Sequence, residues 1–133
     1  MASVVADTHA LVWYLVDPAR LSPVASAALD EAVDGGGAIF VSAISLVEIV
    51  YLVEKGRLPQ AVNDRLHEAL KAPDAGITVV ALDQELAWYV GQVPRTSVPD
   101  LPDRIIAATA LRFNLPLVTR DAKIRSSGIA TVW

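Results

Sequence analysis

Four acidic residues of this 133-residue chain have types and spacings that could support chemistry: Asp7, Glu48, Asp103 and Asp121. Two of them follow short apolar runs, because Asp7 comes directly after Val4–Ala6 and Asp121 comes shortly after residues 117–119. Such runs predict buried strands. In α/β proteins, ligands bind beyond the carboxyl ends of parallel strands. We therefore expect both carboxylates at the same edge of a sheet.

Glu48 and Asp103 are expected on helices. Glu48 interrupts an apolar segment and shares a helical stripe with Ile44, Tyr51 and Leu52. A lone carboxylate on such a stripe is costly to desolvate unless a cation or another partner compensates its charge. Asp103 lies in the first turn of an expected helix, where the helix dipole stabilises a negative charge by about 0.3–1 kcal/mol.

Carboxylates that share one pocket indicate a divalent cation. They repel one another, so one of them takes up a proton unless a cation is present. Oxygen ligands without His or Cys favour Mg²⁺, with Mn²⁺ as a substitute. A water bound to such an ion can attack a phosphodiester, and hydrolysis is the chemistry indicated. A polyanionic substrate would need a basic rim, for which the candidates are Arg104, Arg120, Lys123 and Arg125.

Each acid also has an ordinary structural explanation when it is considered alone. Asp7 can cap the helix that follows it, Asp121 can lie in a turn, and Glu48 can pair with a buried arginine. Asp103 can be a capping acid, with Asp100 as an alternative N-cap. These explanations weaken when the four are taken together, because all of them can converge at one end of one sheet.

Three further polar residues near these acids are expected to be structural. His9 follows the strand-end acid and is expected to pack at a helix start rather than act as a general base. Ser42 and Ser45 are expected to satisfy backbone groups or to orient Glu48, because no His–acid pair accompanies them as nucleophiles.

Short apolar strands alternate with helices along the chain. The expected strands cover residues 3–6, 39–41, 77–82, 117–119 and 129–132. The expected helices cover residues 9–16, 23–33, 43–55, 59–71, 84–90 and 102–113, with a proline-containing loop over residues 93–101. Strands that are apolar throughout and alternate with helices indicate an α/β fold, in which helices cover both faces of a parallel sheet. The length fits a single domain over residues 1–133.

Composition limits the class of protein further. The apolar fraction of 53% indicates a sheet buried on both faces or an apolar subunit interface. The net charge of −4 argues against a simple nucleic-acid-binding module, although six of the eleven basic residues lie in the last third. No apolar run reaches the roughly 18–20 residues of a membrane span. The N-terminus has no basic segment, and the chain has no cysteine, so we expect a cytoplasmic protein without a membrane anchor.

Four segments resemble the signature blocks of PIN-domain proteins. They are VVADTHALVWYL, VSAISLVEIVYL, PDLPDRIIAATAL and LPLVTRDAKI. Their order and spacing, over nearly the whole chain, resemble those of the toxin in a VapBC-type toxin–antitoxin pair. The resemblance implies a Rossmann-like α/β/α sandwich and a metal-dependent endoribonuclease that acts as a type II toxin.

The resemblance also implies particular site residues and partners. The implied catalytic and metal-binding residues are Asp7, Glu48, Asp103 and Asp121. Thr119 matches a small hydroxyl residue that supports this site. Typical members have another acid or polar residue just beyond the fourth acid, whereas Ala122 and Lys123 follow here, so a second metal site would be weak. The implied partners are RNA, a VapB-like antitoxin and a second copy of the chain, with DNA reached only through the antitoxin.

Apolar residues that could serve a dimer or an antitoxin helix are Trp13, Tyr14, Val50, Val53 and Trp88, each of which could equally belong to the core. Two other functions stay open at this point. One is a phosphohydrolase with Asp7 as covalent nucleophile, against which His9 counts, because such enzymes usually have a second acid there. The other is a non-catalytic PIN-like interaction domain, against which the presence of all four acids counts.

Overall fold

A five-stranded parallel sheet forms the centre of the computed structural model, which describes residues 2–133. Its strands are β1 Val4–Ala6, β2 Ile39–Ser42, β3 Ile77–Val80, β4 Leu117–Val118 and β5 Thr131–Val132. Their order is β3-β2-β1-β4-β5, so that β1 lies in the middle with β2 and β4 on either side. The parallel sheet expected from the apolar strands is confirmed.

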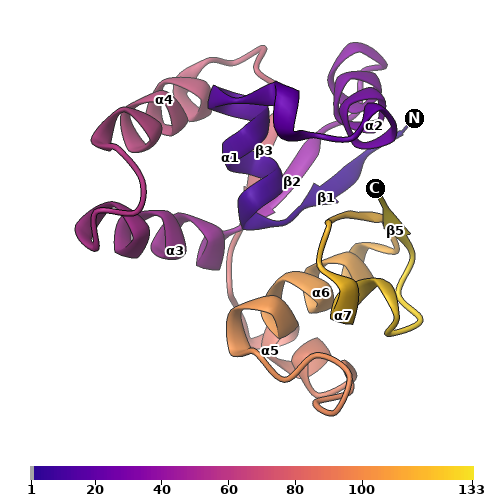
Figure 1. The fold of residues 1–133 in the computed structure, drawn as a ribbon. Helices are drawn as coiled ribbons and strands as arrows, with labels where there is room; N and C mark the ends of the chain where they lie inside the picture. The colour runs from indigo at the N-terminus through magenta and orange to yellow at the C-terminus, as the bar shows by residue number, and fades with distance from the viewer. Residues whose placement is uncertain (1) are drawn as a thin grey trace.

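Helices cover both faces of the sheet, as Figure 1 shows. They are α1 Thr8–Val16, α2 Pro23–Asp34, α3 Ala43–Glu54, α4 Gln60–Lys71, α5 Gln84–Val90, α6 Leu101–Phe113 and α7 Ala122–Arg125, with a 3-10 turn at Pro18–Arg20. Alternate residues of β1 serve the two faces: Val4 and Ala6 pack in the cluster with α1 and α2, and Val5 packs in the cluster with α5 and α6. This period of two explains why the strand is apolar throughout.

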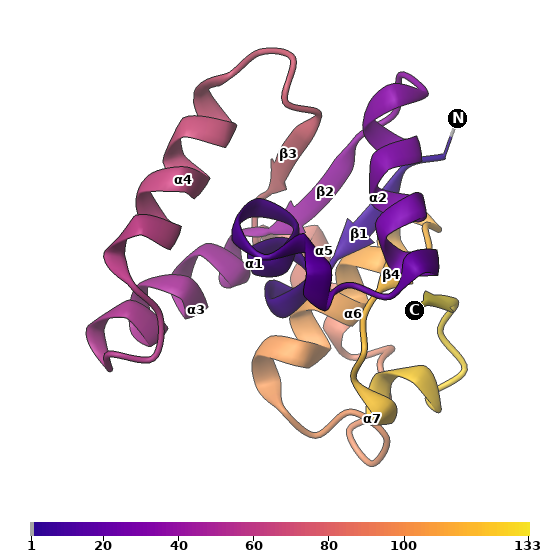
Figure 2. The same cartoon turned by 45° about the horizontal axis from the view of Figure 1, so that its top comes forward.

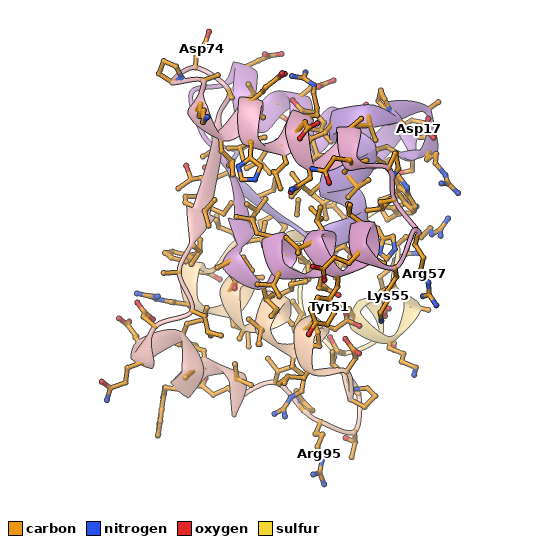
Figure 3. All side chains as sticks on the ribbon, turned by 90° about the vertical axis from the view of Figure 1, so that its left-hand side faces the viewer. Asp17, Tyr51, Lys55, Arg57, Asp74 and Arg95 are labelled. Atoms are coloured by element: carbon orange, nitrogen blue, oxygen red, sulfur yellow. The ribbon has the colours of Figure 1, made fainter. Side chains whose placement is uncertain are left out.

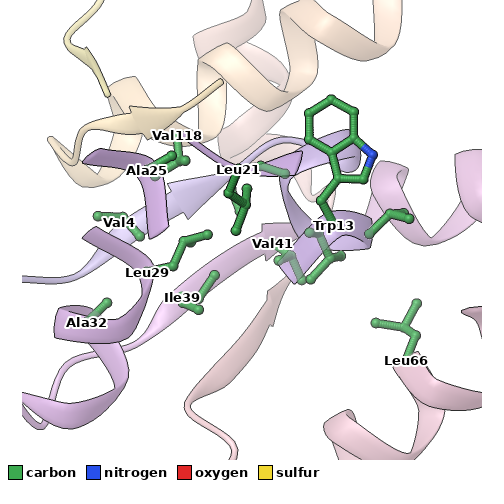
Figure 4. Packing of buried hydrophobic residues seen from close by; sticks show 14 of the residues in the cluster. Val4, Trp13, Leu21, Ala25, Leu29, Ala32, Ile39, Val41, Leu66 and Val118 are labelled. Atoms are coloured by element: carbon green, nitrogen blue, oxygen red, sulfur yellow. The ribbon is translucent and has the colours of Figure 1, made fainter. Parts of the chain in front are cut away.

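The first core layer lies between α2 and the sheet. Figure 4 shows Ala25, Leu29 and Ala32 of α2 facing Val4 and Ile39 of the strands. The spacing of these helix residues by four and three places them on one face. Leu29 is fully buried. Ser22 starts this helix, because its hydroxyl accepts a hydrogen bond from the amide of Ala25 at 3.0 Å, as the Ser-Pro sequence predicts.

The helices α3 and α4 form a hairpin that packs against α1, as Figures 1 and 2 show. Gly56, with a φ of 72°, lies in the turn after α3. None of the helices in residues 2–133 is both long and apolar enough to cross a bilayer.

Three strand ends pass almost directly into helices, and this determines where polar side chains gather. Asp7 follows β1 and is the N-cap of α1, Ser42 ends β2 and is the N-cap of α3, and Asp121 follows β4 and is the N-cap of α7. Because β1, β2 and β4 are adjacent and parallel, these caps lie at one edge of the sheet.

The predicted element boundaries differ from the observed ones by small amounts. The last strand covers only residues 131–132 instead of 129–132, and β3 ends at residue 80 instead of 82. The 3-10 turn at Pro18–Arg20 and the helix α7 were not predicted. Each is too short for apolar periodicity to be recognisable, and α7 depends on its cap, Asp121.

Candidate active site

One pocket of about 360 Å³ is lined by all four acidic residues that the sequence singled out: Asp7, Glu48, Asp103 and Asp121. The remaining lining residues are His9, Trp13, Asp100 and Arg120. The pocket lies beyond the carboxyl ends of β1 and β4, with α3 and α6 contributing from the two sides. The expected convergence of the four carboxylates is therefore what the structure shows.

Asp7 caps a helix and lines the pocket at the same time. Its Oδ1 accepts a hydrogen bond from the amide of Ala10 at 2.8 Å, and its Oδ2 accepts one from the hydroxyl of Thr119 at 2.5 Å. Burial raises the pKa of the Asp7 carboxyl, while the hydrogen bonds from Thr119 and Ala10 act in the opposite direction. The capping explanation and the active-site explanation are thus both compatible with this residue.

Thr119 connects the two strand-end acids. Its fully buried hydroxyl donates to Asp7 and accepts from the amide of Asp121 at 3.0 Å. Asp121 in turn accepts hydrogen bonds at its Oδ1 from the amides of Lys123 and Ile124, at 2.9 and 3.0 Å. The hydroxyl of Thr119 therefore fixes the separation of β1 and α7, which agrees with the supporting position that the family resemblance implies.

Glu48 is held by the hydroxyl of Thr8, which in turn contacts the hydroxyl of Ser45. The hydroxyl of Thr8 donates to Glu48 Oε1 at 2.6 Å and lies 2.9 Å from the hydroxyl of Ser45. The single proton of Thr8 goes to the carboxylate, so the Ser45 hydroxyl is the donor to Thr8. The ion pairs of residues 2–133 do not include Glu48, which argues against its pairing with a buried arginine.

Thr8 is a site residue that the sequence analysis missed. It is buried in the first turn of α1, and it touches a glutamate 40 positions away. The available signal was its place between Asp7 and His9, directly after a strand-end acid. Apolar periodicity does not reveal a contact of this kind, because the partner lies on another helix.

The pKa of Asp103 reflects the negative charges that surround it in the pocket. The N-cap of α6 is Asp100, whose Oδ2 accepts from the amide of Asp103 at 3.2 Å, so the alternative cap is the observed one. The pKa of Asp103 is raised to about 7, first by burial and then by the negative charges of Asp100, Asp121, Glu48 and Asp7. These charges therefore act on one another within one partly desolvated space.

The donor set fits a hydrated divalent cation. No ion pair in the described chain involves any of the four acids, so no salt bridge neutralises their charges. Within residues 2–133, no three acidic or histidine side chains are grouped tightly enough to enclose an ion directly. Mg²⁺ usually keeps several waters and takes only one or two carboxylates directly, which suits an open pocket of this size.

The expected basic rim is present only in part. Arg120 lines the pocket, and Lys123 and Arg125 are exposed on α7 but do not line it. The placement of Arg104 at the rim was wrong, because its guanidinium donates to the carbonyls of Val90 and Val93 at 2.9 and 3.0 Å. It ties α6 to the end of α5 and the loop that follows.

The apolar residues considered for an interface divide between core and surface. Trp13 is only 6% exposed and belongs to the core and the pocket wall. Tyr14 and Val53 are partly buried against the same core cluster. Val50 and Trp88 are exposed, the latter by 73%. Of this set, only Val50 and Trp88 are exposed enough to contact a partner.

Comparisons with known proteins agree with this architecture. The PIN domain model matches residues 4–128. The chain is 31% identical to Ribonuclease VapC22 of Mycobacterium tuberculosis over 95% of this chain and 92% of that protein. The fold is similar to a chain of VapBC2 from Rickettsia felis bound to a promoter DNA fragment, with a TM-score of 0.72 and 19% identity, covering 97% of this chain and 96% of that one. It is also similar to a chain of a Klebsiella pneumoniae toxin–antitoxin complex, with a TM-score of 0.65 and 22% identity, covering 98% and 96%.

The fold and the site together define the class of this protein. It is a parallel α/β/α sandwich with a carboxylate pocket at its strand ends. Within that class, the chain belongs to the PIN domain family.

Proposed function

We propose that this protein is a divalent-metal-dependent endoribonuclease and the toxin of a type II toxin–antitoxin pair. The observation that carries the proposal is the pocket at the strand ends, where four carboxylates meet and none of them forms a salt bridge. The similarity to a protein named as a ribonuclease supports RNA as the substrate. The similarity to chains from toxin–antitoxin complexes supports a small antitoxin as partner.

The residues of the pocket divide into those that hold a cation and those that orient them. Asp7, Glu48, Asp103 and Asp121 would hold Mg²⁺, or Mn²⁺ in its place. The cation would supply charge neutralisation and an activated water for hydrolysis of a phosphodiester. Thr119 holds Asp7 through its hydroxyl, and Thr8 holds Glu48, so these two carboxylates are oriented before any ligand arrives. Arg120 contributes positive charge at the wall of the same pocket.

RNA cleavage in the presence of Mg²⁺ or Mn²⁺ tests the proposal. We expect cleavage to disappear with EDTA and to fall by at least about a hundredfold in Asp7→Asn, because this change removes a ligand charge from the pocket. Asp74→Asn is the matched control: it alters an exposed aspartate that does not line the pocket, and it should leave the rate unchanged (Figure 3). Cleavage that survives both EDTA and Asp7→Asn would refute the mechanism.

The structure does not favour a covalent phosphohydrolase. Both oxygens of Asp7 already accept hydrogen bonds, from Ala10 and Thr119, and the position two residues after Asp7 has His9 in place of a second acid. Such an enzyme forms a phosphoryl-aspartate as its covalent intermediate. Mass spectrometry of the protein after reaction with a phosphate ester should therefore find no such adduct.

We also propose that the protein acts in the cytoplasm and forms a homodimer, while DNA is contacted only through the antitoxin. Exposed apolar side chains on α3 and α5 support a subunit or antitoxin interface; they are Val47, Val50, Tyr51 and Trp88. Light scattering on the chain alone should give twice the mass of one chain, and a monomer at all concentrations would contradict the dimer.

A further inference from the structure

A second cleft of about 340 Å³ adjoins the acidic pocket. The two share a wall made of His9, Trp13 and Arg120. Two more arginines, Arg20 and Arg57, line the second cleft, and no acidic residue of the described chain does so. We call it the arginine cleft. The sign of the lining charge therefore reverses across the shared wall, from carboxylates on one side to guanidinium groups on the other.

Trp13 holds two of these arginines in place. The guanidinium carbon of Arg120 lies 4.8 Å from the centroid of the Trp13 ring, and that of Arg20 lies 5.1 Å from it. The ring itself is fixed, since it is 6% exposed and packs against His9 and Trp133. Stacking occupies the flat face of a guanidinium and leaves its N–H groups at the edge for an anion.

No carboxylate of residues 2–133 forms an ion pair with the three arginines of the arginine cleft. The ion pairs of residues 2–133 involve Arg65 and Arg112 only, and no carboxylate pairs with Arg20, Arg57 or Arg120. Arg57 comes from the turn after α3, and Figure 3 shows it beyond the end of that helix. Like charges brought together in one cleft repel, so the arrangement favours an anionic ligand that relieves the repulsion.

We propose that the arginine cleft binds a backbone phosphate of the RNA strand, adjacent to the phosphate that is cleaved in the acidic pocket. This inference rests on the proposed ribonuclease function. In this proposal, a strand whose scissile phosphate lies in the acidic pocket continues across the wall that the two clefts share. Arg120, which lines both sides of that wall, is placed to contact the backbone at this crossing.

The geometry favours phosphate over other anions. The flat forks of Arg20 and Arg120 are held at one aromatic ring, and guanidinium groups suit the paired oxygens of a phosphodiester. Val12, Leu52 and Leu58 also line the cleft, together with Thr8. A phosphate held in this way fixes the position of the strand without reading its sequence.

Binding of a short fluorescein-labelled single-stranded RNA tests the cleft separately from cleavage. Anisotropy is measured in EDTA over a series of salt concentrations for the wild type, Arg20→Ala and Arg57→Ala. The control is Arg95→Ala, which alters an exposed arginine in the loop before α6, away from Arg57 (Figure 3). We expect each cleft variant to weaken binding about tenfold and to reduce the slope of log Kd against log salt by about 0.7. The control should match the wild type.

Lysine variants separate the effect of the positive charge from the effect of the planar guanidinium. Arg20→Lys and Arg57→Lys keep the charge but not the planar fork, so they should keep the salt slope of the wild type and lose part of the affinity. Thermal unfolding of every variant checks that the chain remains folded. With Mg²⁺ present, the cleft variants should raise KM more than they lower kcat, because their contact lies away from the scissile bond.

The outcomes for the cleft and for the proposed function can be told apart. Unchanged Kd and salt slope in both alanine variants overturn the cleft, even if cleavage proceeds normally. If the variants lose affinity for a labelled acidic peptide but not for RNA, the cleft accepts carboxylates, and the proposal is wrong. If RNA binding depends on Arg20 and Arg57 but no metal supports cleavage, the ribonuclease function fails and the phosphate-binding cleft stands.

Discussion

The carboxylates of Asp7 and Glu48 are each oriented by a threonine hydroxyl, and the two threonines were not equally predictable. Thr119 could be assigned because it matches a family position near Asp121, whereas Thr8 makes its contact with a residue 40 positions away. Residue types and spacing predicted which acids would meet. They did not predict the role of Thr8, because its contact with Glu48 depends on how α1 packs against α3.

Removal of the Thr8 hydroxyl should lower activity without unfolding the protein. Thr8→Val keeps the shape of the side chain but leaves Glu48 without its 2.6 Å donor. Groups that orient metal ligands are typically worth about 10–100-fold in activity or metal affinity. We expect a loss of that size in kcat/KM and a higher Mg²⁺ requirement, while Thr8→Ser should retain most of the activity. Equal activity of the valine and serine variants would show that the hydroxyl has no positioning role.

Asp103 should make the metal-free protein less stable as pH rises. Its pKa increases from 3.8 to about 7 on folding, so the folded state binds the proton more tightly than the unfolded state. This contribution to stability is complete below 3.8 and is lost as the pH rises through about 7. Urea unfolding in EDTA should show that the wild type loses more stability over this interval than Asp103→Asn does. Parallel pH curves for the two proteins would contradict the assignment.

At the scale of elements, strands and long helices were predictable because burial imposes a period on the sequence. The three apolar residues of β1 serve both faces of the sheet, and Ala25, Leu29 and Ala32 mark the buried face of α2. Short elements lack such a period. The four-residue helix α7 depends on its cap, Asp121, and the same residue was therefore assigned to the site without its helix being recognised.

Arg104 was assigned to substrate binding from its charge alone, but in the structure it joins two helical elements. A basic residue next to Asp103 resembles a substrate contact, yet its guanidinium joins α6 to the carbonyls of Val90 and Val93. Arg104→Ala leaves these carbonyls without a donor, and we expect it to lower the free energy of unfolding by about 1–3 kcal/mol. RNA affinity and its salt dependence should stay as in the wild type. If Arg104→Ala reduced the slope of log Kd against log salt and left the stability unchanged, Arg104 would be a substrate contact after all.

At the scale of the whole molecule, the net charge of −4 is the sum over regions of opposite charge, among them a negative pocket and a positive cleft. The acidic pocket and the arginine cleft lie on either side of Trp13, so an overall negative chain still offers positive charge where a polyanion would extend. The composition could not show this, because it does not report which charges are brought together. The packing of α1, the 3-10 turn at Pro18–Arg20, the turn after α3 and the strand end of β4 determines that arrangement.

Neutralisation of the acidic pocket should stabilise the whole fold. A ligand that binds only the folded state raises stability by about 2.7 kcal/mol at a hundredfold excess over its Kd. Mg²⁺ should therefore raise the Tm of the wild type by several degrees, and more strongly above neutral pH, where Asp103 no longer holds a proton. Calorimetric scans with increasing Mg²⁺ measure this directly. The increase should be lost in Asp7→Asn and kept in Asp74→Asn, because only the first residue lines the pocket. A Tm that rises equally in both variants would mean that Mg²⁺ acts on the general surface charge, and the pocket would then not be the site that it fills.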